Sequence, residues 1–399
     1  MNEMDHKADP KEKEFAESDK NNDERPADYP KAPLFDRSGF GQYGNTDRNK
    51  TDNAQVDKNY SRKIEDHGAI RPERPDFDSE YYSQKRSLFV LGNAIGLPLC
   101  MFFFISYALN FLVGFGLSAI AGVYTANRFL SDPNVSNVLG SCVSLIAFTV
   151  PYLYTLKVTD STFAELVPVK KVSPSKCSAL VMLGFGAFTL STLVTEILAL
   201  YSVRLFGVSF ESVDTDYNAD SLSLSLMLLC VGVLPAILEE FAFRGVILST
   251  LRKKFSDSSA IIISAAMFGM LHGNLMQTPF AFCMGIMLGY AAVYSGSIIP
   301  SVIIHMLTNC ISVLMNFAMV NTSPMERQVG TLLYYAVALV IGICGFIMLT
   351  KSDKNALKLS NERSENTLRF SGWFLRSTWI LVFITLCVLQ ILAVQGVFK

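Results

Sequence analysis

Long apolar blocks separated by short polar connections fill the chain from Ser87 onward. Because the hydrocarbon layer of a membrane is ~30 Å thick, about 20 apolar helical residues are needed to cross it. The blocks that approach or exceed this length are residues 87–124, 136–156, 177–203, 221–251, 258–275, 279–295, 298–320, 331–350 and 374–397. The pattern therefore predicts an all-α, polytopic transmembrane helix bundle of about eight or nine spans.

A soluble all-helical core would need polar residues along one face of each helix, with a period of 3.6 residues. The blocks of this chain are instead apolar on all sides, as in helices that lipid or other membrane helices surround. The first block, residues 87–124, leaves two arrangements open. It suits one long span bent at Pro98, or a re-entrant pair of shorter helices.

Residues 1–86 have a different composition. They carry 16 of the 34 Lys and Arg residues and 20 of the 35 Asp and Glu residues, more than half of all the charge in the chain. Such a stretch buries too little apolar surface to offset the entropy of ordering it, so we expect a disordered tail. Its mixed charge argues against binding to nucleic acid. The sequence thus predicts this tail, a helical bundle over 87–350, and a polar loop with one further membrane helix over 351–399.

Basic residues gather in every second connection between the apolar blocks. These connections contain Lys85 and Arg86; Lys157, Lys170, Lys171 and Lys176; Arg252, Lys253 and Lys254; and Lys351, Lys354, Lys358, Arg363 and Arg369. The intervening connections contain only Arg128, Arg204 and Arg327. Since positive residues are retained on the cytoplasmic side, we expect a multi-pass protein of the cell membrane with its N-terminal tail in the cytoplasm.

Few ionisable residues lie within the apolar blocks, and the segment Glu239-Glu240-Phe241-Ala242-Phe243-Arg244 holds three of them. Each ionised side chain at membrane depth costs about 2.5–3.5 kcal/mol, so its presence requires an explanation. Residues four apart share one face of a helix, which predicts a structural ion pair between Glu240 and Arg244. Glu239 lies about 100° around the helix and is left to accept a proton from water. A solvated helix end, close to the basic turn at 252–254, is the simpler alternative.

Two further polar pairs have the same four-residue spacing. Phe268 and His272 place an aromatic ring beside an imidazole, whereas His305 and Asn309 place an imidazole and a carboxamide on one face. The second pair is suited to hydrogen-bonding an oxyanion. Each pair alone also fits a structural role, because His and Asn form hydrogen bonds between membrane helices.

The positions of these residues along their helices favour a common site. The blocks 221–251 and 258–275 predict an antiparallel hairpin with a turn near residue 254. Glu239 and His272 are nearly equidistant from that turn, with a mismatch of roughly 3 Å at 1.5 Å per residue. We therefore expect the two side chains to face each other.

We also expect Glu239, His272 and His305 to line a water-filled cavity that opens to the cytoplasm. The block 221–251 is longer than the hydrocarbon layer is thick, so part of it can project inward. Pro235, one turn before the carboxylates, predicts a kink that widens the cavity, because proline removes a backbone donor and disrupts the preceding turn.

In this order and on successive apolar helices, the three pairs resemble the motifs EExxxR, FxxxH and HxxxN of the CPBP family of membrane proteins, also called the Abi family. That family includes type II CAAX prenyl proteases and bacteriocin-processing or self-immunity proteins. The resemblance covers about residues 175–320. It implies hydrolysis of a membrane-associated peptide or protein inside the bilayer. Glu239 and His272 would activate water, with Phe268 as a positioning residue, and His305 and Asn309 would stabilise the oxyanion.

The sequence leaves the need for a metal ion open. Glu239, His272 and His305 could supply the three protein ligands of a catalytic zinc site, and the family carries a metalloprotease label. However, the HExxH motif is absent, and the cation of Arg244 disfavours a divalent ion nearby. We therefore favour catalysis without a metal or other cofactor.

Two other classes of function are compatible with the same residues. A non-catalytic membrane protein could hold a peptide in this cavity, as an immunity or regulatory protein would. A proton-coupled transporter would also place Glu and His residues at membrane depth. The resemblance favours the intramembrane endopeptidase over both alternatives.

Overall fold

The computed structural model describes residues 77–158, 161–208, 221–359 and 372–395. These residues form helices and no strand, and seven of the helices are long and apolar enough to cross a membrane by length and composition. Two shorter apolar helices, Asp257–Leu271 and Thr378–Val394, accompany them. The predicted all-α, polytopic bundle is confirmed. Most of the predicted tail lies outside the described residues, and the part from Phe77 onward belongs to the first long helix.

The described helices follow one another along the chain. They are α2 (Phe77–Ala121), α3 (Val123–Leu130), α4 (Pro133–Val158), α5 (Phe163–Leu166), α6 (Pro174–Phe206), α7 (Ser221–Met227), η3 (Leu228–Val233), α8 (Leu234–Glu240), η4 (Phe241–Ile247), α9 (Leu248–Leu251), α10 (Asp257–Leu271), α11 (Gln277–Ser295), α12 (Ile299–Met319), α13 (Pro324–Ser352) and α15 (Thr378–Val394).

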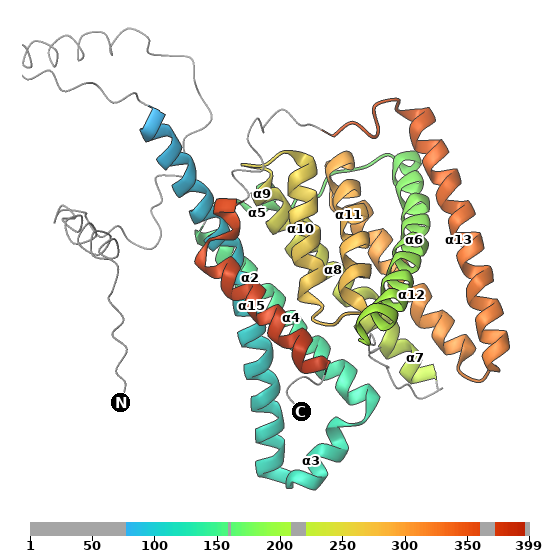
Figure 1. The fold of residues 1–399 in the computed structure, drawn as a ribbon. Helices are drawn as coiled ribbons and strands as arrows, with labels where there is room; N and C mark the ends of the chain where they lie inside the picture. The colour runs from blue at the N-terminus through green and yellow to red at the C-terminus, as the bar shows by residue number, and fades with distance from the viewer. Residues whose placement is uncertain (1–76, 159–160, 209–220, 360–371, 396–399) are drawn as a thin grey trace, which may run out of the picture.

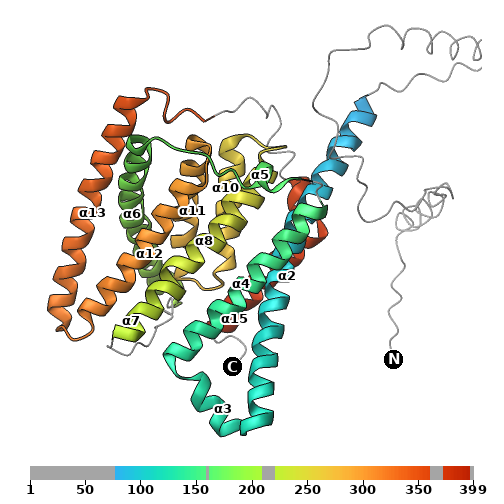
Figure 2. The same ribbon diagram turned by 180° about the vertical axis from the view of Figure 1, so that it is seen from behind.

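Two groups of helices make up the bundle (Figures 1 and 2). In one group, α2 packs against both α4 and α15, although α15 comes last in the chain. In the other, α11 lies between α10 and α6, and α13 packs along the outer side of α6. The segment from α7 to α9 joins the groups, because α8 contacts both α4 and α12. The polar residues of interest therefore lie on central helices.

The first apolar block forms one helix rather than a re-entrant pair. α2 runs without interruption from Phe77 to Ala121, with Pro98 inside it. At 45 residues it is about 68 Å long, which exceeds the ~30 Å hydrocarbon thickness twofold. Of the two arrangements that the sequence left open, the structure has the single long helix.

The block 221–251 is helical throughout but contains two π-helical turns, η3 and η4, that the sequence did not predict. Pro235 explains the first, because it has no N–H to bond the carbonyls one turn earlier. Two side chains bond those carbonyls instead: the Ser141 hydroxyl donates to Cys230 O at 3.3 Å, and the Asn309 amide donates to Val231 O at 3.3 Å. Within a membrane, where water is scarce, such replacement donors are needed.

The block predicted over 258–275 forms a shorter helix than expected. α10 has 15 residues and is about 22 Å long, less than the ~30 Å of the hydrocarbon layer. Gly273 terminates it with a left-handed φ of 65°, which favours glycine. Asn274 then holds the turn, donating to His272 O at 3.2 Å and accepting from Gln277 N at 2.7 Å. His272 consequently lies at the end of a helix, at a turn whose backbone is bonded within the protein.

The side of the membrane on which each connection lies remains a prediction. Lys254, between α9 and α10, and Met325, at the start of α13, are both exposed and lie at opposite ends of the bundle. In a variant whose native cysteines are replaced by alanine, we expect a membrane-impermeant thiol reagent to label Met325→Cys, but not Lys254→Cys, in intact cells. Permeabilised cells, in which both sites react, provide the control. The opposite labelling pattern in intact cells would reverse the orientation.

Candidate active site

Glu240 and Arg244 form an ion pair that is completely buried at membrane depth. Arg244 Nη1 donates to Glu240 Oε1 at 2.7 Å, and the side chains are 1% and 0% exposed. Two further contacts hold the guanidinium: Nη2 approaches Gly285 O at 3.5 Å, and the guanidinium carbon lies 4.3 Å from the centroid of the Phe268 ring. The four-residue spacing in the sequence thus corresponds to a real pair, and its members are fixed on several sides.

The Phe268 ring connects this ion pair to both membrane-embedded histidines. Its edge-to-face contacts place the His272 imidazole at a centroid distance of 4.9 Å and the His305 imidazole at 6.0 Å. Phe243 packs against the same ring at 5.0 Å. Since Phe268 is itself 2% exposed, its position is determined by close packing. The three polar pairs of the sequence therefore meet around one aromatic ring.

His305 lies between the two adjacent glutamates. Its Nδ1 is 2.9 Å from Glu240 Oε1, and its Nε2 is 3.8 Å from Glu239 Oε2. With Glu240 ionised beside Arg244, the Nδ1 position carries the proton and donates to the carboxylate. The sequence placed Glu239 opposite His272, whereas the ionic contact in the structure joins Glu239 to His305. The difference arises because α12 packs directly against α8.

Glu239 has the less satisfied of the two carboxylates. Both glutamates have a buried Oε2 without a hydrogen-bond partner among the described residues, but Glu239 is 17% exposed and outside the ion pair, whereas Glu240 is 0% exposed and its Oε1 is bound to Arg244. A buried carboxylate oxygen ordinarily accepts hydrogen bonds, so the Oε2 of Glu239 is available to a water molecule or to a polar group of a bound peptide.

His272 is held in one tautomer by the helix that it ends. Its Nδ1 lies 2.9 Å from Phe268 O, and because a carbonyl can only accept, Nδ1 carries the hydrogen. In the neutral ring, Nε2 then has a lone pair that can accept a proton or a hydrogen bond. The i,i+4 relation between Phe268 and His272 thus acts twice, through the ring contact and through this backbone bond.

Asn309 has a structural partner that the sequence did not indicate. One hydrogen of its amide bonds Val231 O, the carbonyl released by Pro235. The amide has a second hydrogen, which remains available for another acceptor. The position of Asn309 on the same helix face as His305 is therefore compatible with both a structural and a chemical role.

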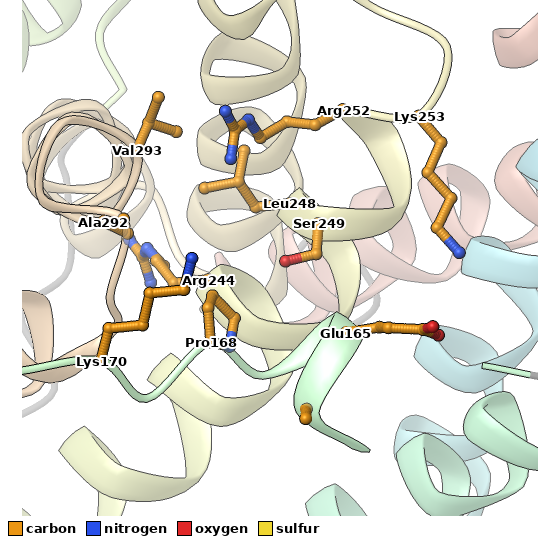
Figure 3. Close-up of a pocket in the computed structure, with 12 residues that line it drawn as sticks. Glu165, Pro168, Lys170, Arg244, Leu248, Ser249, Arg252, Lys253, Ala292 and Val293 are labelled. Atoms are coloured by element: carbon orange, nitrogen blue, oxygen red, sulfur yellow. The ribbon is translucent and has the colours of Figure 1, made fainter. Parts of the chain in front are cut away.

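A cavity of about 540 Å³ opens at the end of the bundle where three connections meet (Figure 3). Its lining residues are Ala164, Glu165, Pro168, Lys170, Arg244, Leu248, Ser249, Arg252, Lys253, Ala292, Val293 and Gly296. Glu239, His272 and His305 are not among them. This cavity, which reaches inward to Arg244, is thus distinct from the one predicted around Glu239, His272 and His305, and that cavity stays a prediction.

The described residues contain no group of three His, Cys, Asp or Glu side chains that could hold a metal ion. His305 and both glutamates are close together, but the Nδ1 of His305 is engaged by Glu240, which is itself bound to Arg244. This donor set does not fit a divalent ion well, because a fixed cation lies within it. Catalysis without a metal stays a prediction.

Residues 221–311 match the family model described as type II CAAX prenyl endopeptidase Rce1-like. Among curated proteins, the membrane-embedded CAAX protease MroQ of Staphylococcus aureus (strain USA300) is 25% identical over 193 residues, which cover 46% of this chain and 74% of that protein. No solved structure matches. The matched segment contains all seven residues of the three motifs: Glu239, Glu240, Arg244, Phe268, His272, His305 and Asn309.

The ion pair generates a test with a matched control. Arg244→Ala leaves Glu240 buried without its cation, which should cost roughly 3–5 kcal/mol and lower the thermal stability and yield of the purified protein. Arg252→Ala is the control: it removes an ion pair with Asp257 that has the same 2.7 Å distance, but the Arg252 side chain is 38% exposed. Its loss should cost at most about 1 kcal/mol. Equal unfolding temperatures for the two variants in detergent would contradict a dry site around Arg244.

Proposed function

We propose that this chain is an intramembrane endopeptidase that uses Glu239 as the general base, which its similarity to type II CAAX prenyl endopeptidases over residues 221–311 supports. The observation that carries the proposal is the environment of Glu239: a carboxylate on an apolar helix, next to a buried ion pair but outside it, and 17% exposed where Glu240 is 0% exposed. The family supports a peptide bond as the substrate.

Water activation is the task of Glu239 and His272. Glu239 removes a proton from water while the oxygen of that water attacks the carbonyl carbon of the scissile bond. The lone pair on Nε2 of His272 accepts a second hydrogen bond from the same water and orients it. The proton held by Glu239 then passes to the leaving amine, which restores the carboxylate.

Oxyanion stabilisation is the task of His305 and Asn309. His305 Nδ1 donates to Glu240, and its Nε2 lies 3.8 Å from Glu239 Oε2. We assign a proton to this Nε2 as well and place the oxygen of the tetrahedral intermediate beside it. The second amide hydrogen of Asn309 is the other donor, while its first holds Val231 O. Arg244 keeps Glu240 in place and makes no contact with the substrate.

The substrate is a membrane-associated peptide or protein. Processing of a prenylated C-terminus, of a leader peptide or of a membrane-bound regulator would use the same chemistry. The natural substrate can be found by comparing the membrane peptides of cells that carry the native protein or Glu239→Gln. A fragment that is present with the native protein and absent with the variant identifies the cleaved bond.

The assigned roles predict graded effects on turnover. Glu239→Gln and His272→Ala should each nearly abolish cleavage and leave substrate binding in place, because water activation matters only in the chemical step. Asn309→Ala should lose about 10²–10³-fold. Glu196→Gln, an exposed glutamate on α6, is the matched control and should retain full activity. Undiminished cleavage by Glu239→Gln would refute Glu239 as the general base. Binding of the substrate without cleavage by the native protein would favour a non-catalytic regulator.

Chelation tests the prediction of metal-free catalysis. We expect the cleavage rate of the purified protein to be unchanged after treatment with EDTA and unaffected by added zinc, because Arg244 holds a positive charge beside the glutamates. The metal content should be measured on the same samples. Reversible loss of activity on chelation, together with zinc bound in proportion to the native protein but not to His272→Ala, would make the histidines ligands instead.

A further inference from the structure

The cavity of Figure 3 is built from three connections at one end of the bundle. The segment between α4 and α6, the turn after α9 and the turn after α11 all contribute to its lining. Two hydrogen bonds connect the segment between α4 and α6 to the turn after α11. Ile298 N donates to Pro168 O at 2.9 Å, and Lys170 N donates to Ser297 Oγ at 3.1 Å. The positive-inside rule assigns this end to the cytoplasm.

Cationic groups point into the cavity from different elements. Figure 3 shows the ends of Lys170 and Arg252 directed toward a common space, with the Ser249 hydroxyl also facing it and Arg244 behind Lys170. Glu165, the one acidic residue of the lining, lies at the other end of the cavity beside Lys253. A ligand in the common space would therefore meet Lys170, Arg252 and the Ser249 hydroxyl, whereas Arg244 is 1% exposed and already bound to Glu240.

Two of these cations already have carboxylate partners, and the third does not. Arg244 is bound by Glu240, and Arg252 Nε lies 2.7 Å from Asp257 Oδ1. The ammonium group of Lys170 has no ion pair or hydrogen bond with any described residue. An uncompensated ammonium, directed into a cavity beside two guanidinium groups, indicates a site for an anion.

The number and arrangement of the donors favour a phosphate over a carboxylate. Donors from Lys170, Arg252 and Ser249 approach from separate sides, which suits the several oxygens of a tetrahedral anion. Two large apolar side chains next to lining residues are exposed: Phe163 is 53% exposed and Val169 is 61% exposed. At the membrane interface, such residues would contact acyl chains. Basic pockets between membrane helices on the cytoplasmic side have the chemistry that binds phospholipid headgroups.

We propose that this cavity binds the phosphate headgroup of an anionic phospholipid from the cytoplasmic leaflet, with Lys170, Arg252 and Ser249 as its contacts. This proposal does not depend on proteolysis, because none of these three residues belongs to the catalytic group. Binding can therefore be measured in the full-length protein carrying Glu239→Gln, and its failure would leave the proposed peptidase activity untouched.

The test compares two neighbouring lysines. Lys170 lines the cavity, whereas Lys171 is also exposed but is absent from the lining. Fluorescent phosphatidylglycerol is titrated into the detergent-solubilised protein, with phosphatidylcholine as the neutral reference lipid. We expect Lys170→Gln to weaken phosphatidylglycerol binding about fivefold and Lys171→Gln to leave it within error, since one well-placed cation near a membrane surface contributes a factor of this size. The difference should shrink as salt is added.

Competitors distinguish the sources of the anion. Equal binding by Lys170→Gln and Lys171→Gln, or equal affinity for the neutral lipid, would overturn the proposal. Inorganic phosphate that binds in a Lys170-dependent way while phosphatidylglycerol does not would make the ligand a soluble phosphate and refute the lipid assignment. Displacement of the lipid by a short peptide with a free C-terminal carboxylate, but not by the corresponding amide, would assign the cavity to the end of a peptide.

Discussion

The buried ion pair between Glu240 and Arg244 is the interaction on which the rest of the site depends. Two opposite charges at this depth are tolerated only when each has a fixed partner, because removal of either leaves the other uncompensated in an apolar medium. Glu240 Oε1 receives hydrogen bonds from Arg244 and from His305, so one oxygen links the EExxxR helix to α12. Arg244 covers the face of Phe268, which in turn contacts both imidazoles. The pair therefore positions the histidines through a carboxylate on one side and an aromatic ring on the other.

A second constraint is the need to satisfy backbone groups inside a membrane. Pro235 and the π-helical turns release carbonyls on the central helix, and these would be costly if left unbonded. Ser141, Asn309 and Ser264 supply donors to Cys230 O, Val231 O and Phe243 O. These bonds connect the irregular helix to α4, α12 and α10. The irregular backbone thus contributes to helix association. Asn309, which we also propose as an oxyanion donor, takes part in this backbone bonding.

The sequence predicted the class of fold and the main contacts of the site because the signals are local. Apolar blocks indicate spans, and the four-residue spacing pairs Glu240 with Arg244 and Phe268 with His272 on single helices.

Relations between helices were harder to predict. The contact of His305 with Glu239 depends on how α12 packs against α8, which no spacing within one helix encodes. The early end of α10 had a local signal, Gly273 followed by Asn274, but the apolar residues beyond it concealed the turn. The basic cavity combines connections that are far apart in the chain.

Glu239 and Glu240 illustrate how two identical neighbours acquire different chemistry. A helix separates adjacent side chains by about 100°, so one carboxylate turns to Arg244 while the other does not. Glu240 is 0% exposed and its Oε1 is bound by Arg244 and His305, which leaves that oxygen no access to a substrate. Glu239 is 17% exposed and lies outside the ion pair. Because Arg244 is bound to Glu240, the carboxylate of Glu239 is left to act on water. The fixed pair thus creates the electrostatic conditions for a neighbouring base, and the two carboxylates cannot exchange roles without rotating the helix.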